Sequence, residues 1–171
     1  MSNSLKSMVP ENFIYRYRFW RARLLSLGLR QGKNYTLSSE ERKASAAISV
    51  IVPIHDAPDV TERCLLSLER NCGEAEVILI DDGSKEKRTL NIIDRAAARR
   101  GWSVTRNENP SGHSRACEKG AEKAQRNFLC FLNSDTVITP FSWAGIIKAF
   151  THDPSVGVVG PSTSRTGTIQ R

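Results

Sequence analysis

The stretch ISVIVPIHDAPDVTERCLLSLERN, residues 48–71, decides the fold class. Its first seven residues are nearly all apolar, as in a strand that is covered on both faces. Its second half places Cys64, Leu65 and Leu68 on one face of a helix, and Pro58 suits the first turn of that helix. A buried strand followed directly by an amphipathic helix is typical of a parallel sheet.

The same alternation of strand and helix continues along the chain. Further strands are predicted at 76–80, 102–106, 128–132 and 156–159. Further helices are predicted at 88–100, 114–126 and 141–150. Ser84 can cap the first of these helices and Gly101 can end it, while Thr139 and Pro140 start the last. The pattern predicts an α/β fold with a mainly parallel sheet, helices on both faces and right-handed crossovers.

The basic charge lies mostly in the N-terminal segment. The net charge is +7, and residues 1–45 hold nine Lys and Arg against three Glu, whereas the other 126 residues hold 16 basic and 15 acidic side chains. The main domain is therefore nearly neutral, and we expect no nucleic acid as a partner.

An amphipathic helix is predicted in this segment. Large apolar residues recur there at helical spacing: Phe13, Tyr17, Trp20, Leu24 and Leu27. Arginines flank this stripe. We expect residues 1–30 to form a basic helical arm, 31–46 a polar linker and 47–171 the main domain. The arm fits an anionic membrane surface, and it fits docking onto the main domain or a partner protein equally well.

The cysteines and the hydropathy pattern suggest a cytoplasmic protein. Cys64, Cys72, Cys117 and Cys130 are too far apart for a CxxC zinc pattern, and reduced structural thiols are expected. No apolar stretch is long enough to span a bilayer, and the start MSNSLKSMVP lacks the apolar region of a secretory signal. The arm would allow peripheral contact with the inner face of the membrane.

Polar residues follow each of the first four predicted strands, at 55–56, 81–84, 107–113 and 133–135. In a parallel sheet these segments share one edge, where ligands bind near the reversal of strand order. Neither GxGxxG nor GxxxxGK[ST] is present, so a cradle of backbone amides for phosphate is not indicated. Carboxylates at such an edge suit a hydroxyl, an amine, or a divalent cation that carries a phosphate, and Mg²⁺ or Mn²⁺ is then expected. Each segment alone is also common turn chemistry, so only their joint occurrence carries weight.

Together VIVPIHD, ILIDDGS, NPSGHSRACEKG and FLNSDT resemble the sugar-nucleotide half of the family 2 glycosyltransferases, over residues 47–165. Members of this family are inverting enzymes with the GT-A fold. The resemblance implies that Pro53, His55 and Asp56 lie against a uracil or thymine base and that Asp82 contacts this base.

The resemblance also implies roles for the third and fourth motifs. Gly112 and Arg115 would contact the nucleotide. Asn133 and Ser134 would do so from the position of the family's Asp-x-Asp motif, and Asp135 matches its metal-binding acid. Asn133 stands where many members have Asp, a form found in the rhamnosyltransferase-like branch.

The implied activity is transfer of a sugar from a UDP or dTDP sugar to an acceptor hydroxyl in polysaccharide biosynthesis, with Mg²⁺ or Mn²⁺ as cofactor. The resemblance further implies that the acceptor half is absent from residues 1–171 and that the catalytic base lies beyond Arg171. The alternative is a non-catalytic module of the same fold that binds a nucleotide sugar or a partner. A receiver-like domain fits less well, because its acid pair would follow the first strand and a Lys the fifth, where this chain has Gly160 and Pro161.

Overall fold

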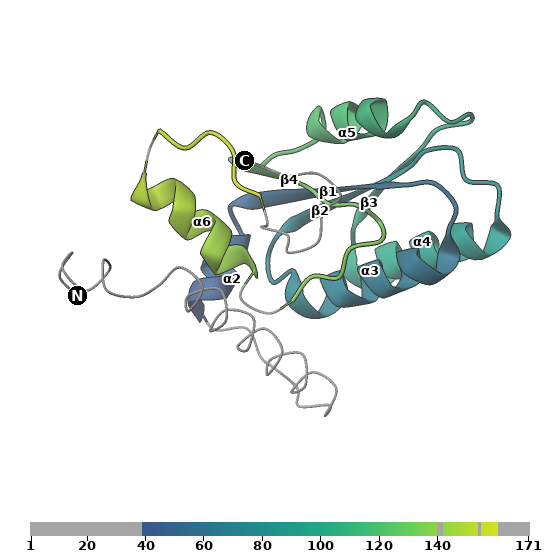
Figure 1. Cartoon of the computed structure of the whole chain (residues 1–171). Helices are drawn as coiled ribbons and strands as arrows, with labels where there is room; N and C mark the ends of the chain where they lie inside the picture. Colours follow the sequence, from purple (N-terminus) through teal and green to yellow (C-terminus); the bar gives the residue numbers. More distant parts are fainter. Residues whose placement is uncertain (1–38, 140–141, 154, 161–171) are drawn as a thin grey trace, which may run out of the picture. The chain divides into compact units, whose positions relative to one another are not determined.

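A computed structural model describes residues 39–139, 142–153 and 155–160 of the chain (Figure 1). The predicted arm of residues 1–30 lies outside the described residues, as does the first half of the predicted linker. The described part of that linker contains a short helix, α2 (Ser39–Ser45), which the polar composition did not reveal. None of the described helices is long and apolar enough to cross a membrane.

The four described strands form one parallel sheet. They are β1 (Ile48–Ile54), β2 (Glu76–Asp81), β3 (Ser103–Arg106) and β4 (Phe128–Phe131). Their order is β3-β2-β1-β4, and every neighbouring pair runs parallel. From β1 the chain moves to one side for β2 and β3 and then to the other side for β4. The reversal between β1 and β4 is where a doubly wound sheet binds its ligands.

Helices cover both faces of this sheet, as the sequence predicted. They are α3 (Pro58–Asn71), α4 (Lys87–Arg100), α5 (His113–Ala121) and α6 (Ser142–His152). Figure 1 shows α3 and α4 on one face and α5 on the other. The two faces of β1 therefore both lie in a core, which explains why its seven residues are all buried.

Two apolar cores result from this layering. On the larger side, Val50 and Val52 of β1 share a cluster with Leu65 and Leu68 of α3 and with Trp143 of α6.

The smaller core joins α5 to β1 and β2. Ile51, Ile78 and Ile80 pack there with Ala116. Gly120 lets α5 approach β1 closely, because a Cβ at this position would lie 2.3 Å from Cγ2 of Ile51.

Three expectations about the elements were wrong. Residues 156–159 form no strand in the structure, and no described strand pairs with them to satisfy their backbone groups. Helix α5 ends at Ala121 rather than near Arg126. Ser84 does not cap α4, because its hydroxyl accepts the Asp56 N–H and the N-cap residue is Glu86. Gly101 does end α4, with φ of 67°.

Candidate functional site

Backbone hydrogen bonds beyond the strands bring together the polar segments 55–56, 81–84, 107–113 and 133–135 at one edge of the sheet. We call these four segments the rim. The Asp82 N–H donates to the Ile54 carbonyl at 2.7 Å, and the Asn107 N–H donates to the Asp81 carbonyl at 2.8 Å. On the other side of β1, the Leu132 N–H donates to the Ile51 carbonyl at 2.9 Å. The residues that follow β1, β2, β3 and β4 therefore begin at neighbouring positions, as the parallel topology requires.

Asp82 accepts more hydrogen bonds than the other acids at this edge, and we call its carboxylate the hub of the rim. Its Oδ1 accepts hydrogen bonds from Nδ2 of Asn107 at 2.7 Å and from the N–H and the hydroxyl of Ser111 at 2.8 and 2.7 Å. Its Oδ2 accepts the Gly112 N–H at 2.8 Å. Burial alone would raise the pKa of Asp82, but these donors outweigh it and lower the pKa to about 2. The carboxylate thus fixes the loop that leads into α5.

Gly83 brings this loop close to the Asp82 backbone. It has φ of 76°, and a Cβ there would lie 2.7 Å from the backbone N of Pro110. Both the positive φ and the contact require glycine. Gly112, the N-cap of α5, also has a positive φ, 92°, although a Cβ there would meet nothing within 4 Å.

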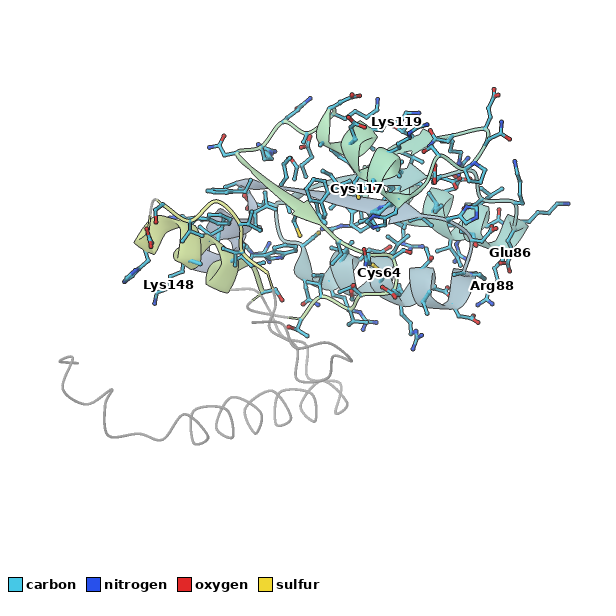
Figure 2. The ribbon with its side chains drawn as sticks, turned by 45° about the horizontal axis from the view of Figure 1, so that its top comes forward. Cys64, Glu86, Arg88, Cys117, Lys119 and Lys148 are labelled. Carbon is cyan, nitrogen blue, oxygen red and sulfur yellow. The ribbon has the colours of Figure 1, made fainter. Side chains whose placement is uncertain are left out.

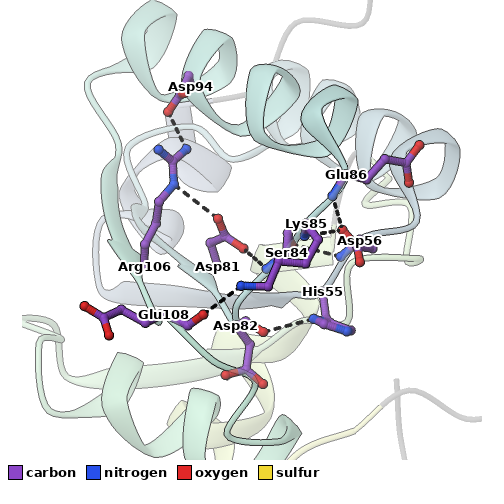
Figure 3. Close-up of polar contacts among 10 residues, drawn as sticks. All are labelled: His55, Asp56, Asp81, Asp82, Ser84, Lys85, Glu86, Asp94, Arg106 and Glu108. Carbon is purple, nitrogen blue, oxygen red and sulfur yellow. Dashed lines mark hydrogen bonds and ion pairs between the residues drawn. The ribbon is translucent and has the colours of Figure 1, made fainter.

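The neighbouring Asp81 has a structural role. It is 1% exposed, its Oδ1 accepts the Ser84 N–H at 3.0 Å, and its Oδ2 accepts Nε of Arg106 at 3.1 Å. Arg106 continues to Asp94 of α4 at 2.6 Å (Figure 3). Of the two adjacent acids, Asp81 therefore anchors β3 and α4, while Asp82 shapes the rim.

Asp56 is also held by backbone donors. Its Oδ1 accepts the N–H groups of Lys85 and Glu86, each at 2.9 Å (Figure 3). The hydrogen bond from Glu86 is the main cause that lowers the pKa of Asp56. This carboxylate closes the turn before α4 across about thirty residues of chain.

His55 and Pro53 differ in their access to the rim. His55 is exposed, and its Nδ1 lies 2.9 Å from the Asp82 carbonyl. A carbonyl only accepts, so Nδ1 carries the hydrogen, and Nε2 of the neutral ring is an acceptor. Pro53, in contrast, is buried within β1 opposite Ile80.

The segment after β4 carries an unpartnered acid. The Thr136 N–H donates to the Asn133 carbonyl at 3.0 Å, which closes a turn over Ser134 and Asp135. Nε2 of His113 lies 3.0 Å from Oδ1 of Asn133. Asp135 is exposed, and no described residue forms a hydrogen bond or ion pair with its carboxylate. Its charge does act on the nearby Cys64 thiol.

Helix α5 faces this segment with its first turns. Figure 2 shows Cys117 and Lys119 along α5 and Cys64 on the opposite side of the sheet. Sγ of Cys117 lies 3.7 Å from Nδ1 of His113. The predicted contact Arg115 is exposed in the first turn of α5.

Sequence reasoning missed the residues that hold the hub. Asn107, Ser111 and Lys119 were not singled out, yet Nζ of Lys119 donates to Oδ1 of Asn107 at 2.5 Å while Asn107 and Ser111 donate to Asp82. Asn107 and Ser111 lie in the segment 107–113 after β3, which was the available signal for them, whereas Lys119 lies in α5. Within the described residues, no group of three His, Cys, Asp or Glu could hold a metal ion by itself. The four cysteines are free, as expected.

Comparison with known proteins identifies the family. The model of glycosyl transferase family 2 matches residues 49–170. The chain belongs to this family. Among curated relatives, an uncharacterized glycosyltransferase of Haemophilus influenzae is 36% identical over 95 residues, which cover 53% of this chain and 37% of the relative. A PGL/p-HBAD biosynthesis glycosyltransferase of Mycobacterium tuberculosis is 30% identical over 121 residues, which cover 68% of this chain and 47% of the relative.

Solved structures support the GT-A fold of this glycosyltransferase domain. TarS 1-349 of S. aureus in complex with UDP has a TM-score of 0.57 at 24% identity, with 68% of this chain and 38% of TarS covered. The mannosyltransferase PcManGT of Pyrobaculum calidifontis in complex with GDP-Man and Mn²⁺ has a TM-score of 0.60 at 18% identity, with 82% and 41% covered. This chain spans less than half the length of these relatives.

Proposed function

We propose that this chain carries the donor-binding part of a family 2 glycosyltransferase, which binds a nucleotide sugar through a divalent cation and transfers the sugar to an acceptor hydroxyl. The observation that carries the proposal is that the acids of the rim differ in their hydrogen-bond partners. Asp81, Asp82 and Asp56 accept internal donors, whereas Asp135 at the end of β4 has no partner among the described residues. One acid is thus left for a cation beside a rigid loop.

The base would lie over the ends of β1 and β2. Uracil and thymine each present one imide N–H, which needs an acceptor. Nε2 of His55 is one candidate, because Nδ1 is held by the Asp82 carbonyl. Oδ2 of Asp82 is the other, since it accepts only the Gly112 N–H and has a second lone pair, whereas Oδ1 already accepts three hydrogen bonds. Both acceptors suit a UDP or dTDP donor.

The diphosphate would lie over the end of β4, at the reversal of strand order. Asp135 offers an anionic oxygen there, and phosphate oxygens would complete the shell of Mg²⁺ or Mn²⁺. Asn133 could add its amide oxygen only by releasing His113. The donor set is therefore one that Mg²⁺ or Mn²⁺ accepts, with most ligands from the substrate. Such a cation stabilises the negative charge that develops on the leaving diphosphate.

Isothermal titration with UDP and dTDP, with and without Mn²⁺, tests this proposal. We expect tighter binding with Mn²⁺, and we expect Asp135→Asn to lose this gain while it folds normally, because the side chain is exposed and unpartnered. Glu122→Gln, an exposed acid at the far end of α5, is the matched control and should bind like the wild type. Absence of binding under all conditions contradicts the proposal, and an unchanged metal gain in Asp135→Asn refutes the role of that residue.

Transfer of the sugar is the second readout. The described residues support donor binding, while none of them is proposed as the general base for the acceptor. Binding of the donor without transfer to any acceptor would indicate a non-catalytic module that binds nucleotide sugars.

A further inference from the structure

Helix α3 contacts both ends of the segment that carries Asp135. Three polar groups on one face of α3, at Cys64, Ser67 and Asn71, bond to the backbone of residues 133–138. All three side chains are buried, with exposed fractions of 0%, 7% and 9%. The proposed function uses none of them.

The contacts are specific to the two ends of the segment. Sγ of Cys64 lies 3.6 Å from the Asn133 carbonyl. At the other end, the hydroxyl of Ser67 accepts the Ile138 N–H at 2.9 Å, and Nδ2 of Asn71 donates to the Ile138 carbonyl at 3.0 Å. The backbone of Ile138 is thus satisfied in both directions by α3.

Asn71 extends this fixation into α6. Its backbone carbonyl accepts Nε1 of Trp143 at 2.6 Å, and Trp143 is 1% exposed. Between the anchored ends the Thr136 N–H donates to the Asn133 carbonyl and also interacts with the Cys64 thiol, and Asp135 is exposed. The place of the Asp135 carboxylate therefore depends on the α3 contacts.

We propose that Ser67 and Asn71, with Cys64, are positioning residues that hold Asp135 where it takes the cation. This inference rests on the proposed function. The short segment between two fixed ends loses little further entropy when a metal and a diphosphate arrive, so the affinity for the metal-bound nucleotide depends on that fixation. The affinity for the nucleotide alone depends on the end of β2 and not on α3.

The chain offers a matched control for Ser67. The hydroxyl of Ser67 donates to the Cys64 carbonyl at 2.7 Å and accepts the Ile138 N–H at 2.9 Å. The hydroxyl of Ser45 donates to the Arg42 carbonyl at 2.7 Å and accepts the Glu74 N–H at 2.9 Å, and Ser45 is 0% exposed. Ser45 thus makes equivalent contacts, but it lies just before β1 and its partner Glu74 just before β2, at the opposite end of the sheet. Ser45→Ala and Ser67→Ala should therefore lower the melting temperature to a similar extent.

The test compares UDP affinity with Mn²⁺ and with EDTA for the wild type, Ser67→Ala and Ser45→Ala. We expect Ser67→Ala to weaken binding about tenfold with Mn²⁺, as for one lost hydrogen bond, and to leave binding in EDTA unchanged. Ser45→Ala should change neither. Ser67→Thr, which keeps the hydroxyl, should restore the affinity. Equal affinities for the two alanine variants with Mn²⁺ overturn the inference while the wild type still binds UDP, so this failure is distinct from failure of the proposed function.

Hydrogen exchange gives a readout that does not depend on the nucleotide. Ser67→Ala should speed exchange of the amides of residues 133–138, and Ser45→Ala should speed exchange at Glu74 instead. If Ser67→Ala does not fold, Asn71→Ala removes the bond to the Ile138 carbonyl and should produce the same two effects. Unchanged exchange in the 133–138 segment overturns the inference.

Discussion

Replacement of Asp82 by Asn tests the hub of the rim most directly. The carboxylate accepts four hydrogen bonds and is 4% exposed, and its pKa falls from 3.8 to about 2. Asn can keep the three bonds to Oδ1, but its NH₂ group would then face the Gly112 N–H. The shift in pKa corresponds to a loss of about 2 kcal/mol in the free energy of unfolding at pH 7.

The pH dependence gives the sign of the effect. A carboxylate whose pKa is lowered by folding stabilises the native state above the unfolded pKa, and this stabilisation is lost as the pH falls through the folded value. For Asp82 the stabilisation is complete above about pH 5, about half of it remains at pH 3, and little is left below pH 2. The stability difference between wild type and Asp82→Asn should shrink accordingly.

Urea unfolding at pH 7, 5, 4 and 3 measures this difference, with Glu122→Gln as a control that should match the wild type at each pH. A difference between wild type and Asp82→Asn that is as large at pH 3 as at pH 7 would refute the electrostatic argument.

The same variant should bind UDP more weakly with or without Mn²⁺, because the loop that Asp82 fixes borders the proposed base site. An effect confined to samples with metal would refute the role at the base.

Two further predictions follow from the rim and from the arm. Gly83→Ala should lower the free energy of unfolding by at least about 2 kcal/mol, because its φ is 76° and its Cβ would meet the backbone of Pro110; a change in urea unfolding below about 0.5 kcal/mol would contradict this packing. Replacement of Arg16, Arg18, Arg21 and Arg23 by Ser should reduce sedimentation with anionic vesicles if the arm binds a membrane, by about 1 kcal/mol per Arg at the surface. Equal sedimentation of both proteins, or none with the wild type, would leave the arm as a docking element.

The fold was largely predictable because its pattern is local. The apolar run of β1 and the helical periodicity of α3 each lie within one continuous stretch of sequence, and the parallel order follows from their alternation. Residues 156–159 have the same apolar character, but a strand also needs a neighbour for its backbone groups, and composition does not supply one. Helix α2 was missed for the opposite reason, because its seven residues are mostly polar and it is too short to show an apolar stripe.

The sequence predicted where the candidate site lies, but it did not predict which hydrogen-bond partners each acid has. The position of each acid after a strand gave the rim, since parallel strands end at one edge. The use of each acid depends on donors that are far away in the sequence: the bonds of Asp56 to Lys85 and of Asp82 to Gly112 span about thirty residues. No local pattern encodes those pairs, so the strand-end pattern alone could not separate a carboxylate that shapes a loop from an exposed one, and only the family resemblance gave Asp82 and Asp135 different roles.

This separation bears on which acid can hold a metal. The Asp82 carboxylate accepts four hydrogen bonds and is 4% exposed, so only the second lone pair of Oδ2 is open to a ligand, and burial would add to the cost of binding a cation there. Asp135 is exposed, and its carboxylate accepts no hydrogen bond from any described residue. Its segment is instead fixed through the backbone at Asn133 and Ile138, which leaves the side chain free while the chain around it is held. The proposed role of Asp135 in metal binding therefore rests on two conditions: no described residue forms a hydrogen bond or ion pair with its carboxylate, and its backbone segment is held at Asn133 and Ile138.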